Sequence, residues 1–380
     1  MTVAGVDLGG SKIAAVLLDD SGAVRGEIWR EHAIAGPDEA VNLIAEVVGE
    51  LASRELASRE LASRERGARE LAGRQLATAQ RAAGQRAAGA PGQLTAVGLS
   101  VAGWLSRDRM EVRTAANLGL SAAPLPGLAE ARLNCPVLME NDGNAAAFAE
   151  YVRGAGQPAE VLLVITLGTG VGGGIVVSGA LAGGSHGLAA EIGHLPIDPA
   201  GPDCCCGGRG CLELYASGPG LAAQARAQAG QPEGAAILSL AGGRPGQITA
   251  RQVVAAARGG DAWATGLLAR AGGAVARAVA CVTPVLDPDL VVLSGSVAMS
   301  AGDLILGPAR RQLARAPALP AVLSPVPIVL GQTGPGAAAL GAAELARRLP
   351  GSFPRGRPPQ ASLAAAEGRT DVHPRNRTRE

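Results

Sequence analysis

The chain has 380 residues, of which 47% are hydrophobic and 2% aromatic, and its formal net charge is +1. A charge so close to zero gives no electrostatic reason to expect nucleic acid or an anionic membrane as a partner, and no uninterrupted apolar run reaches the roughly 18 residues of a membrane span. Length and composition predict a soluble cytoplasmic protein of two domains with an aliphatic core.

Two strands joined by a glycine-rich turn are expected first, over Val3–Leu18, followed by a third strand over Val24–His32 and a helix over Asp38–Gly49. The turn offers backbone N–H groups to an anion, a carboxylate that can hold Mg²⁺ through water, and a positive charge. Taken alone, a glycine-rich hairpin of this kind is often a structural turn that binds no phosphate. Its candidate phosphate-binding residues are Asp7, Gly9, Gly10, Ser11 and Lys12.

The pentapeptide ELASR repeats from Glu50 onward and decays by about residue 85. Its residues favour helix, and each Glu is followed four positions later by an Arg, as in Glu50–Arg54. A step of five residues advances about 140° around a helix, so the repeated leucines spiral and form no single apolar stripe. We therefore expect residues 50–92 to be an exposed, charged helical insertion that chemistry does not need; a partner-binding helix is the alternative.

Next come a buried strand over Leu94–Val101, a second over Pro136–Met139 and a helix over Gly143–Val152. The sequence Glu140-Asn141-Asp142 joins the second strand to the helix. Asp142 is therefore expected near the helix N-terminus, where negative charge is favourable. It is either a helix cap or a general base that accepts the proton of an attacking hydroxyl.

A second strand–turn–strand unit begins at Val161 and contains Thr166, Gly168, Thr169 and Gly170. A strand, not a helix, follows these glycines, which excludes a dinucleotide-binding fingerprint and favours a hairpin that grips phosphate. The first and second units share one pattern. The sequence therefore suggests a duplication, with two lobes facing a cleft.

The segment after Glu191 contains one imidazole and a cluster of thiols, and His194, Cys204, Cys206 and Cys211 make up a Cys₃His set for a structural zinc ion. A disulfide knot is the alternative. It requires an oxidising compartment, and the first residues lack the basic start and apolar run of an export signal. Cys205 is expected to be a spacer in this zinc knuckle.

The last elements expected are a strand over Leu290–Leu293 that leads to Gly295, and a closing helix over Ala337–Leu349. The expected organisation is a small lobe at 1–118 carrying the insertion, a large lobe at 119–335 with the zinc and sugar sites, a closing helix at 336–350 that packs back on the small lobe, and a disordered tail at 351–380.

In combination these motifs resemble the ROK family of sugar kinases and repressors, over roughly residues 3–45 and 94–349. DLGGSK resembles the family's first phosphate loop, ENDGN its catalytic segment, TLGTGVGGG its second phosphate loop, EIGH with CCCGGRGCLE its zinc and sugar signature, and LSGSV its adenosine loop. The resemblance implies an α/β fold of the two-lobed actin, hsp70 and sugar kinase type, related to ribonuclease H, with a cleft between the lobes and a zinc knuckle.

The resemblance also implies ATP-dependent phosphorylation of glucose, as in the family's bacterial glucokinases, with Mg²⁺ and a structural zinc ion and with Asp142 as general base on the sugar 6-hydroxyl. Fructose, N-acetylmannosamine and N-acetylglucosamine are alternative acceptors, and polyphosphate is an alternative donor. A regulator without kinase activity is disfavoured, because the first strand begins near Met1 and leaves no room for a preceding helix-turn-helix. A homodimer or higher homo-oligomer is expected, without nucleic acid or membrane partners. The implied sugar ligands are Gly103, Asn117, Asn141, Asp142, Glu191, His194 and Glu213, and Gly295 and Ser296 join the nucleotide-binding residues.

Overall fold

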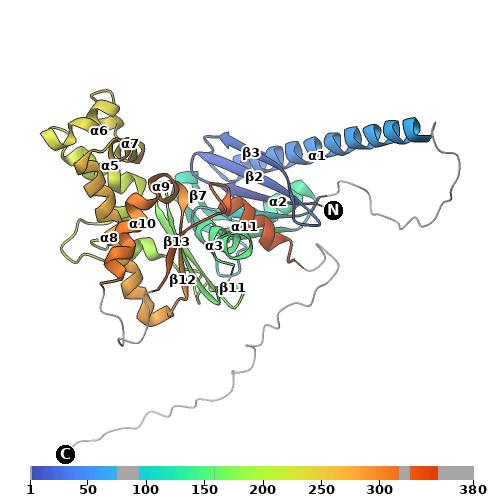
Figure 1. Ribbon diagram of the computed structural model, residues 1–380. Coiled ribbons are helices and arrows are strands. Elements are labelled where there is room, and N and C mark those ends of the chain that lie inside the picture. The colour runs from blue at the N-terminus through green and yellow to red at the C-terminus, as the bar shows by residue number, and fades with distance from the viewer. Residues whose placement is uncertain (1, 75–93, 158, 316–325, 350–380) are drawn as a thin grey trace, which may run out of the picture.

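Two five-stranded sheets with the same internal order form the framework of the protein (Figure 1). The computed structural model describes residues 2–74, 94–157, 159–315 and 326–349, with the backbone alone for 59–74. The sheets run β3-β2-β1-β4-β8 and β11-β10-β9-β12-β13. Each contains an antiparallel hairpin whose first strand pairs in parallel with a later strand, β1 with β4 and β9 with β12. This shared order confirms the predicted two-lobed α/β fold and its duplication.

The first lobe is built from strands and helices drawn from the N-terminal part of the chain. Its elements are β1 (Thr2–Leu8), β2 (Lys12–Asp19), β3 (Val24–Glu31), α1 (Pro37–Arg74), β4 (Leu94–Val101), β5 (Trp104–Leu105), β6 (Val112–Ala115), η1 (Ala116–Leu118), β7 (Leu120–Ala123), α2 (Leu125–Leu133) and β8 (Val137–Asn141). Strands β5, β6 and β7 form a separate small sheet.

The second lobe carries most of the helices. Its strands are β9 (Val161–Leu167), β10 (Val171–Val177), β11 (Ala180–Leu181), β12 (Leu290–Ser294) and β13 (Ile328–Leu330). The helices that follow α3 (Asp142–Arg153) are η2 (Ile192–His194), α4 (Glu213–Ala216), α5 (Gly218–Ala227), η3 (Pro232–Gly234), α6 (Ala235–Leu240), η4 (Pro245–Gln247), α7 (Ala250–Arg258), α8 (Ala262–Leu286), α9 (Gly295–Ala301), α10 (Asp303–Leu313) and α11 (Ala337–Ala346).

Helix α11 packs back on the first sheet although it comes last among the described elements. A Cβ atom on Gly5 of β1 would lie 2.0 Å from the carbonyl oxygen of Ala339, and one on Gly98 of β4 would lie 1.9 Å from that of Ala342. Any side chain at these two glycines would therefore push the helix off the sheet. The helix occupies the place expected for the closing helix, and it does so through backbone contact.

The first sheet continues past the expected lobe boundary at residue 118, because β8 pairs in parallel with β4. β8 leads directly into α3, whose first residue is Asp142. The chain therefore passes from the first sheet to the second lobe at about residue 142, at the start of α3.

Helix α1 is one continuous helix that extends well beyond the sheet it packs on (Figure 1). The predicted helix at Asp38–Gly49 and the repeat segment are thus parts of a single element. The expectation that the whole repeat is exposed is wrong at its start, because Leu51 is 1% exposed and belongs to the core of the first lobe. The predicted ion pair between Glu50 and Arg54 is present. The structure does not describe the paired side chains of the later Glu–Arg pairs of the repeat. Residues 75–92 and the tail at 351–380 lie outside the described residues.

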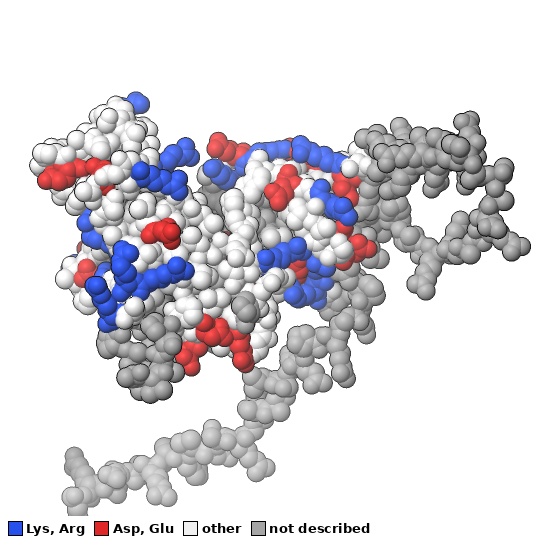
Figure 2. Space-filling model, in the orientation of Figure 1, with Lys and Arg blue, Asp and Glu red and all other residues white. Residues whose placement is uncertain are grey.

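Helix α8 is the one described helix whose length and hydropathy would suffice to cross a membrane, and 56% of its most apolar window is buried inside the protein. It packs against α10 and α7 in the core of the second lobe. On the face shown in Figure 2, both basic and acidic side chains occur on each lobe, with broad neutral areas between them.

We predict that Leu51 contributes to the free energy of unfolding and that Leu56 contributes very little. Both leucines occupy the same ELASR context, but Leu51 is buried whereas Leu56 is 45% exposed. Leu51→Ala should lower the free energy of unfolding by about 2–5 kcal/mol through lost burial and a residual cavity, and Leu56→Ala should change it by less than about 0.5 kcal/mol. Chemical denaturation measures both, and equal effects of the two substitutions would contradict the packing of α1 described here.

Candidate active site

The turn between β1 and β2 contains the first set of predicted phosphate ligands. The backbone N–H of Gly9 donates to the carbonyl of Lys12 at 3.0 Å, which closes the turn. Asn117, in η1, lies against it, since a Cβ atom on Gly10 would come within 2.7 Å of the Asn117 Cβ. Ser11 and Lys12 are exposed beside these contacts. The predicted sugar ligand Asn117 is thus placed next to the phosphate turn.

The carboxylate of Asp7 ends β1 just before this turn. Ser100 of β4 donates its hydroxyl to Asp7 Oδ1 at 2.6 Å. Burial and the negative charge of Asp142 raise the pKa of Asp7 to about 7, and the Ser100 hydrogen bond opposes them. The charges of Asp7 and Asp142 therefore repel each other, and a cation bound near both would relieve this repulsion.

The segment from Asn141 to Asp142 lies where β8 ends and α3 begins. Asn141 caps the helix: its Oδ1 accepts hydrogen bonds from the backbone N–H groups of Gly143 at 2.9 Å and Asn144 at 3.2 Å. Its amide Nδ2 donates to the carbonyl of Gly103 at 3.2 Å. The cap is therefore Asn141, which leaves the Asp142 carboxylate available at the first helical position.

The charge of Asp142 acts on carboxylates at both the phosphate turn and the predicted sugar site. Burial raises its own pKa, against the stabilising effect of nearby backbone N–H groups. Its charge raises the pKa of Asp7 on one side and contributes to the raised pKa of Glu191 on the other. For Glu191 burial is the largest cause, His194 acts in the opposite direction, and Glu213 adds to the rise. The fold thus brings together carboxylates that lie far apart in the sequence.

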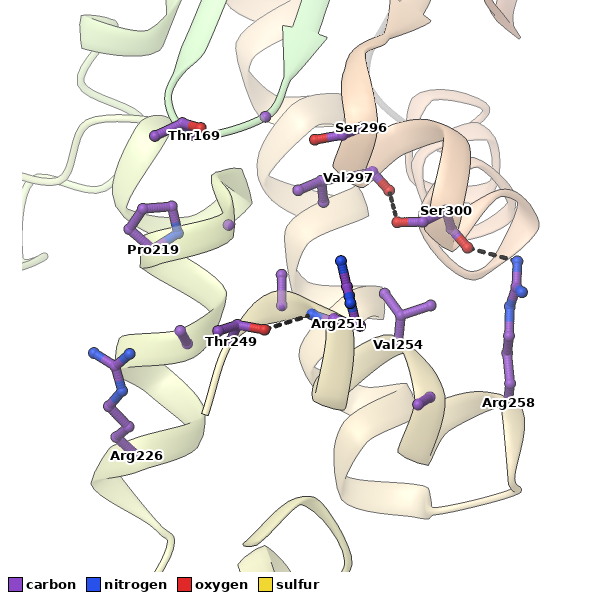
Figure 3. Close-up of a pocket in the computed structure, with 15 residues that line it drawn as sticks. Thr169, Pro219, Arg226, Thr249, Arg251, Val254, Arg258, Ser296, Val297 and Ser300 are labelled. Atoms are coloured by element: carbon purple, nitrogen blue, oxygen red, sulfur yellow. Dashed lines mark hydrogen bonds between the residues drawn. The ribbon is translucent and has the colours of Figure 1, made fainter. Parts of the chain in front are cut away.

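The second glycine-rich turn, between β9 and β10, borders a cavity of about 850 Å³ (Figure 3). Gly168 closes the turn by donating to Gly170 at 2.9 Å. Gly295 has a φ of 89° and lies so close to the end of β9 that a Cβ atom would be 2.6 Å from the carbonyl oxygen of Leu167. This approach brings Ser296 to the same cavity as Gly168 and Thr169.

The rest of this cavity comes mainly from α5 and α7, which no sequence motif marks, and from the part of α9 that follows Ser296. Pro219 of α5, Val254 of α7 and Val297 of α9 form apolar walls, and the guanidinium of Arg251 points from α7 into the space between them (Figure 3). An apolar slot with a few polar groups beside a phosphate-binding turn suits a nucleoside. No local motif marks α5 or α7, so only their packing reveals these residues.

The zinc ligands predicted from the sequence converge in the structure. One ring nitrogen of His194 and the sulfurs of Cys204, Cys206 and Cys211 lie within 4.8 Å of one another. Two of the separations are 3.8 Å, from His194 Nδ1 to Cys204 Sγ, and 3.7 Å, from Cys206 Sγ to Cys211 Sγ. A tetrahedron with Zn–S bonds of about 2.3 Å has edges of about 3.8 Å.

The chemistry of this donor set also fits a zinc ion. Burial and the neighbouring sulfurs raise the pKa of the Cys211 thiol to about 12, so this thiol holds its proton unless a cation compensates the charge of the thiolate. All six cysteines are free, which disfavours the disulfide alternative. Cys205 is exposed and stands outside the ligand set, as predicted for a spacer.

The knuckle is connected to the second phosphate turn through Glu213, the first residue of α4. Its Oε2 accepts a hydrogen bond from the backbone N–H of Val171 at 2.8 Å, and a Cβ atom on Gly170 would also lie 2.8 Å from that oxygen. Since Glu213 follows two residues after Cys211, the Cys/His cluster and the turn that borders the nucleotide cavity are joined through this carboxylate.

Comparison with known proteins agrees with this geometry. Residues 57–349 match the ROK family. A glucokinase of Streptomyces coelicolor is 34% identical over 352 residues, 90% of this chain and 96% of its own length. The crystal structure of a ROK family glucokinase from Streptomyces griseus in complex with glucose and AMPPNP superposes with a TM-score of 0.74 at 30% identity, over 92% of this chain and 100% of that one. An N-acetylmannosamine kinase of Yersinia pestis is 35% identical over 56% of this chain and 68% of its own.

We predict about one zinc ion per chain, held by the four ligands of the knuckle. Cys211→Ser should lower both metal content and thermal stability, with a fall in Tm of more than about 5 °C, because structural zinc contributes directly to folding free energy. Cys205→Ser is the matched control and should retain the metal. Elemental analysis and thermal scans measure both properties, and a wild-type protein that is equally stable after complete chelation would show that the ion has no structural role.

Proposed function

The chain belongs to the ROK family, and we propose that it is an ATP-dependent glucokinase that phosphorylates the 6-hydroxyl of glucose. The observation that carries this proposal is the position of Asp142, whose charge acts on both Asp7 at the first phosphate turn and Glu191 at the sugar site. A phosphoryl donor on one side and an acceptor hydroxyl on the other would meet at this carboxylate. The similarity to glucokinases over nearly the whole chain supports glucose as the acceptor.

In the proposed reaction the 6-oxygen of glucose attacks the γ-phosphorus of ATP, and the bond from that phosphorus to the ADP oxygen breaks. Asp142 accepts the proton that leaves the hydroxyl. Phosphoryl transfer depends mainly on positioning and charge neutralisation. The raised pKa of Asp142 makes it a stronger base than an ordinary aspartate and so better suited to this role near neutral pH.

The donor would lie across the two glycine-rich turns. Both turns would face its phosphates, the first through Gly9, Gly10, Ser11 and Lys12 and the second through Thr166, Gly168, Thr169 and Gly170. The nucleoside would be bordered by Gly295 and Ser296. Asp7 would hold Mg²⁺, which neutralises phosphate charge when bound.

The acceptor would be held by the polar groups around Glu191. Glu191, His194 and Glu213 are suited to the vicinal hydroxyls of a pyranose. Asn117 and Asn141 would complete the sugar site together with Gly103, whose carbonyl accepts a hydrogen bond from Asn141. His194 would bind zinc through Nδ1, the atom that faces Cys204, and present its other ring nitrogen to the sugar. We further propose that the enzyme acts in the cytoplasm as a homodimer or higher homo-oligomer.

Asp142→Asn should preserve the fold and sugar binding and remove the proton acceptor. We expect kcat to fall by about 10²-fold or more, the range typical for loss of a general base. In the wild type, kcat/KM should fall on acidification at a higher pH than an unperturbed aspartate would give, because the base works only when deprotonated and burial raises its pKa. Steady-state kinetics across pH measure both effects. Near-normal turnover of the variant would remove Asp142 from this role.

Glucose should give the highest kcat/KM in an ADP-release assay across glucose, fructose, N-acetylglucosamine and N-acetylmannosamine. A site that hydrogen-bonds hydroxyls discriminates strongly against analogues that leave its polar groups unpaired. A tenfold preference for fructose or an N-acetyl sugar would overturn the choice of substrate and leave the kinase activity standing. Glucose 6-phosphate formed from polyphosphate, with none formed from ATP, would overturn the choice of donor. Absence of phosphorylation with every sugar and donor would overturn the proposed function itself.

A further inference from the structure

A tight turn between β5 and β6 presents an arginine that the proposed chemistry leaves without a role. Arg109 has a left-handed backbone, with φ of 61°, and its N–H donates to the carbonyl of Ser106 at 3.0 Å. The Ser106 hydroxyl braces the turn by donating to Asp108 at 2.6 Å and accepting from the backbone N–H of Glu111 at 3.0 Å. Because the turn is fixed in this way, the direction of the Arg109 side chain is fixed with it.

On one side the Arg109 guanidinium reaches the catalytic segment. Its Nη2 lies 2.9 Å from Glu140 Oε1, and the two side chains are only 16% and 11% exposed. The same Glu140 oxygen accepts hydrogen bonds from the backbone N–H of Asn141 at 2.8 Å and from the Asn144 side chain at 3.0 Å. Glu140 is thus tied to the strand end and the first turn of α3, on either side of Asp142.

On its other side the guanidinium meets the loop that leads to Glu191. A Cβ atom on Gly187 would lie 2.6 Å from Arg109 Nη1, and one on Gly183 would lie 3.3 Å from Nη2. The loop is closed on itself by a hydrogen bond from the N–H of Ala189 to the carbonyl of Gly183 at 3.2 Å. Since Glu191 follows two residues after Ala189, the position of the loop bears directly on the position of this sugar ligand.

We propose that Arg109 is a positioning residue that holds the sugar-side loop at 183–187 in register with the catalytic segment at 140–142. The inference rests on the proposed kinase function of this site. Arg109 comes from the small β5-β6-β7 sheet of the first lobe, Glu140 from the end of the first large sheet, and the loop from the second lobe. One planar cation therefore joins the carboxylate beside the base to the segment that carries Glu191.

The chemistry of arginine suits this task better than that of lysine. The guanidinium is a flat group with donors on two edges, so it can pair with Glu140 on one edge and lie against the glycines of the loop on the other. A shielded ion pair is strongly perturbed when one partner is removed, because the remaining charge is left uncompensated. Loss of Arg109 should therefore disturb Glu140 and the loop together.

The test compares Arg109→Gln with Arg107→Gln, since Arg107 is exposed in the same turn. Arg109→Gln should lower kcat about tenfold through Glu140 and raise the KM for glucose about tenfold through the loop, while the KM for ATP stays within about twofold and zinc content is unchanged. Arg107→Gln should match the wild type in all four quantities. Arg109→Lys keeps the charge and should fall between Arg109→Gln and the wild type, with the loss mainly in the KM for glucose.

A measurement made in the absence of substrate tests this inference independently of the proposed function. Amide hydrogen exchange over residues 183–191 should be faster in Arg109→Gln than in the wild type or in Arg107→Gln. Wild-type kcat, glucose KM and exchange in Arg109→Gln would overturn the inference. An equal loss of glucose binding, ATP binding and zinc in Arg109→Gln, with wild-type kinetics in Arg109→Lys, would also overturn it, because Arg109 would then serve stability alone. A wild-type protein that phosphorylates no sugar would overturn the proposed function, whatever the exchange data show.

Discussion

The arrangement of the site depends on the close backbone contact of α3 with both halves of the molecule. A Cβ atom on Gly143 would lie 2.4 Å from the carbonyl oxygen of Gly173 in β10, and one on Gly341 of α11 would lie 1.7 Å from that of Ala145 in α3. Through β10 the helix touches the second sheet, and through α11 it is connected to the first. Its N-terminus, which carries Asp142, is therefore held where the two lobes meet.

This placement costs stability locally, since carboxylates share a partly desolvated cleft. Burial raises the pKa of Asp7, Asp142 and Glu191, and repulsion from Asp142 adds to the rise for Asp7 and Glu191. Such a group of acids is unfavourable in a resting protein and is typical of a site that handles protons or cations. The Cys/His cluster lies next to the second phosphate turn, because Cys211 is followed closely by Glu213, whose carboxylate accepts a hydrogen bond from the backbone N–H of Val171.

The sequence by itself determined the main strands of the two sheets and the motifs, because both follow from short-range chemistry. Alternating and continuous apolar runs placed the strands, and the glycine-rich turns followed from the strands they join. The spacing of His194, Cys204, Cys206 and Cys211 was sufficient to predict the Cys/His cluster that the structure forms, since those residues lie close together along the chain. The duplicated strand–turn–strand pattern predicted the two sheets that the structure confirms.

Only the tertiary structure decided which of several residues with similar sequence surroundings are buried in the core or line the site. Leu51 and Leu56 have the same adjacent residues in sequence, yet one is buried and the other exposed, because a step of five residues turns Leu56 about 140° around α1 from the buried Leu51. The sequence also left open whether β8 joins the first sheet and which helices form the nucleotide cavity. Arg109 has no motif at all, and its contact with Glu140 joins segments far apart in the chain. Contacts of this kind arise from packing between elements, and no local pattern of residues encodes them.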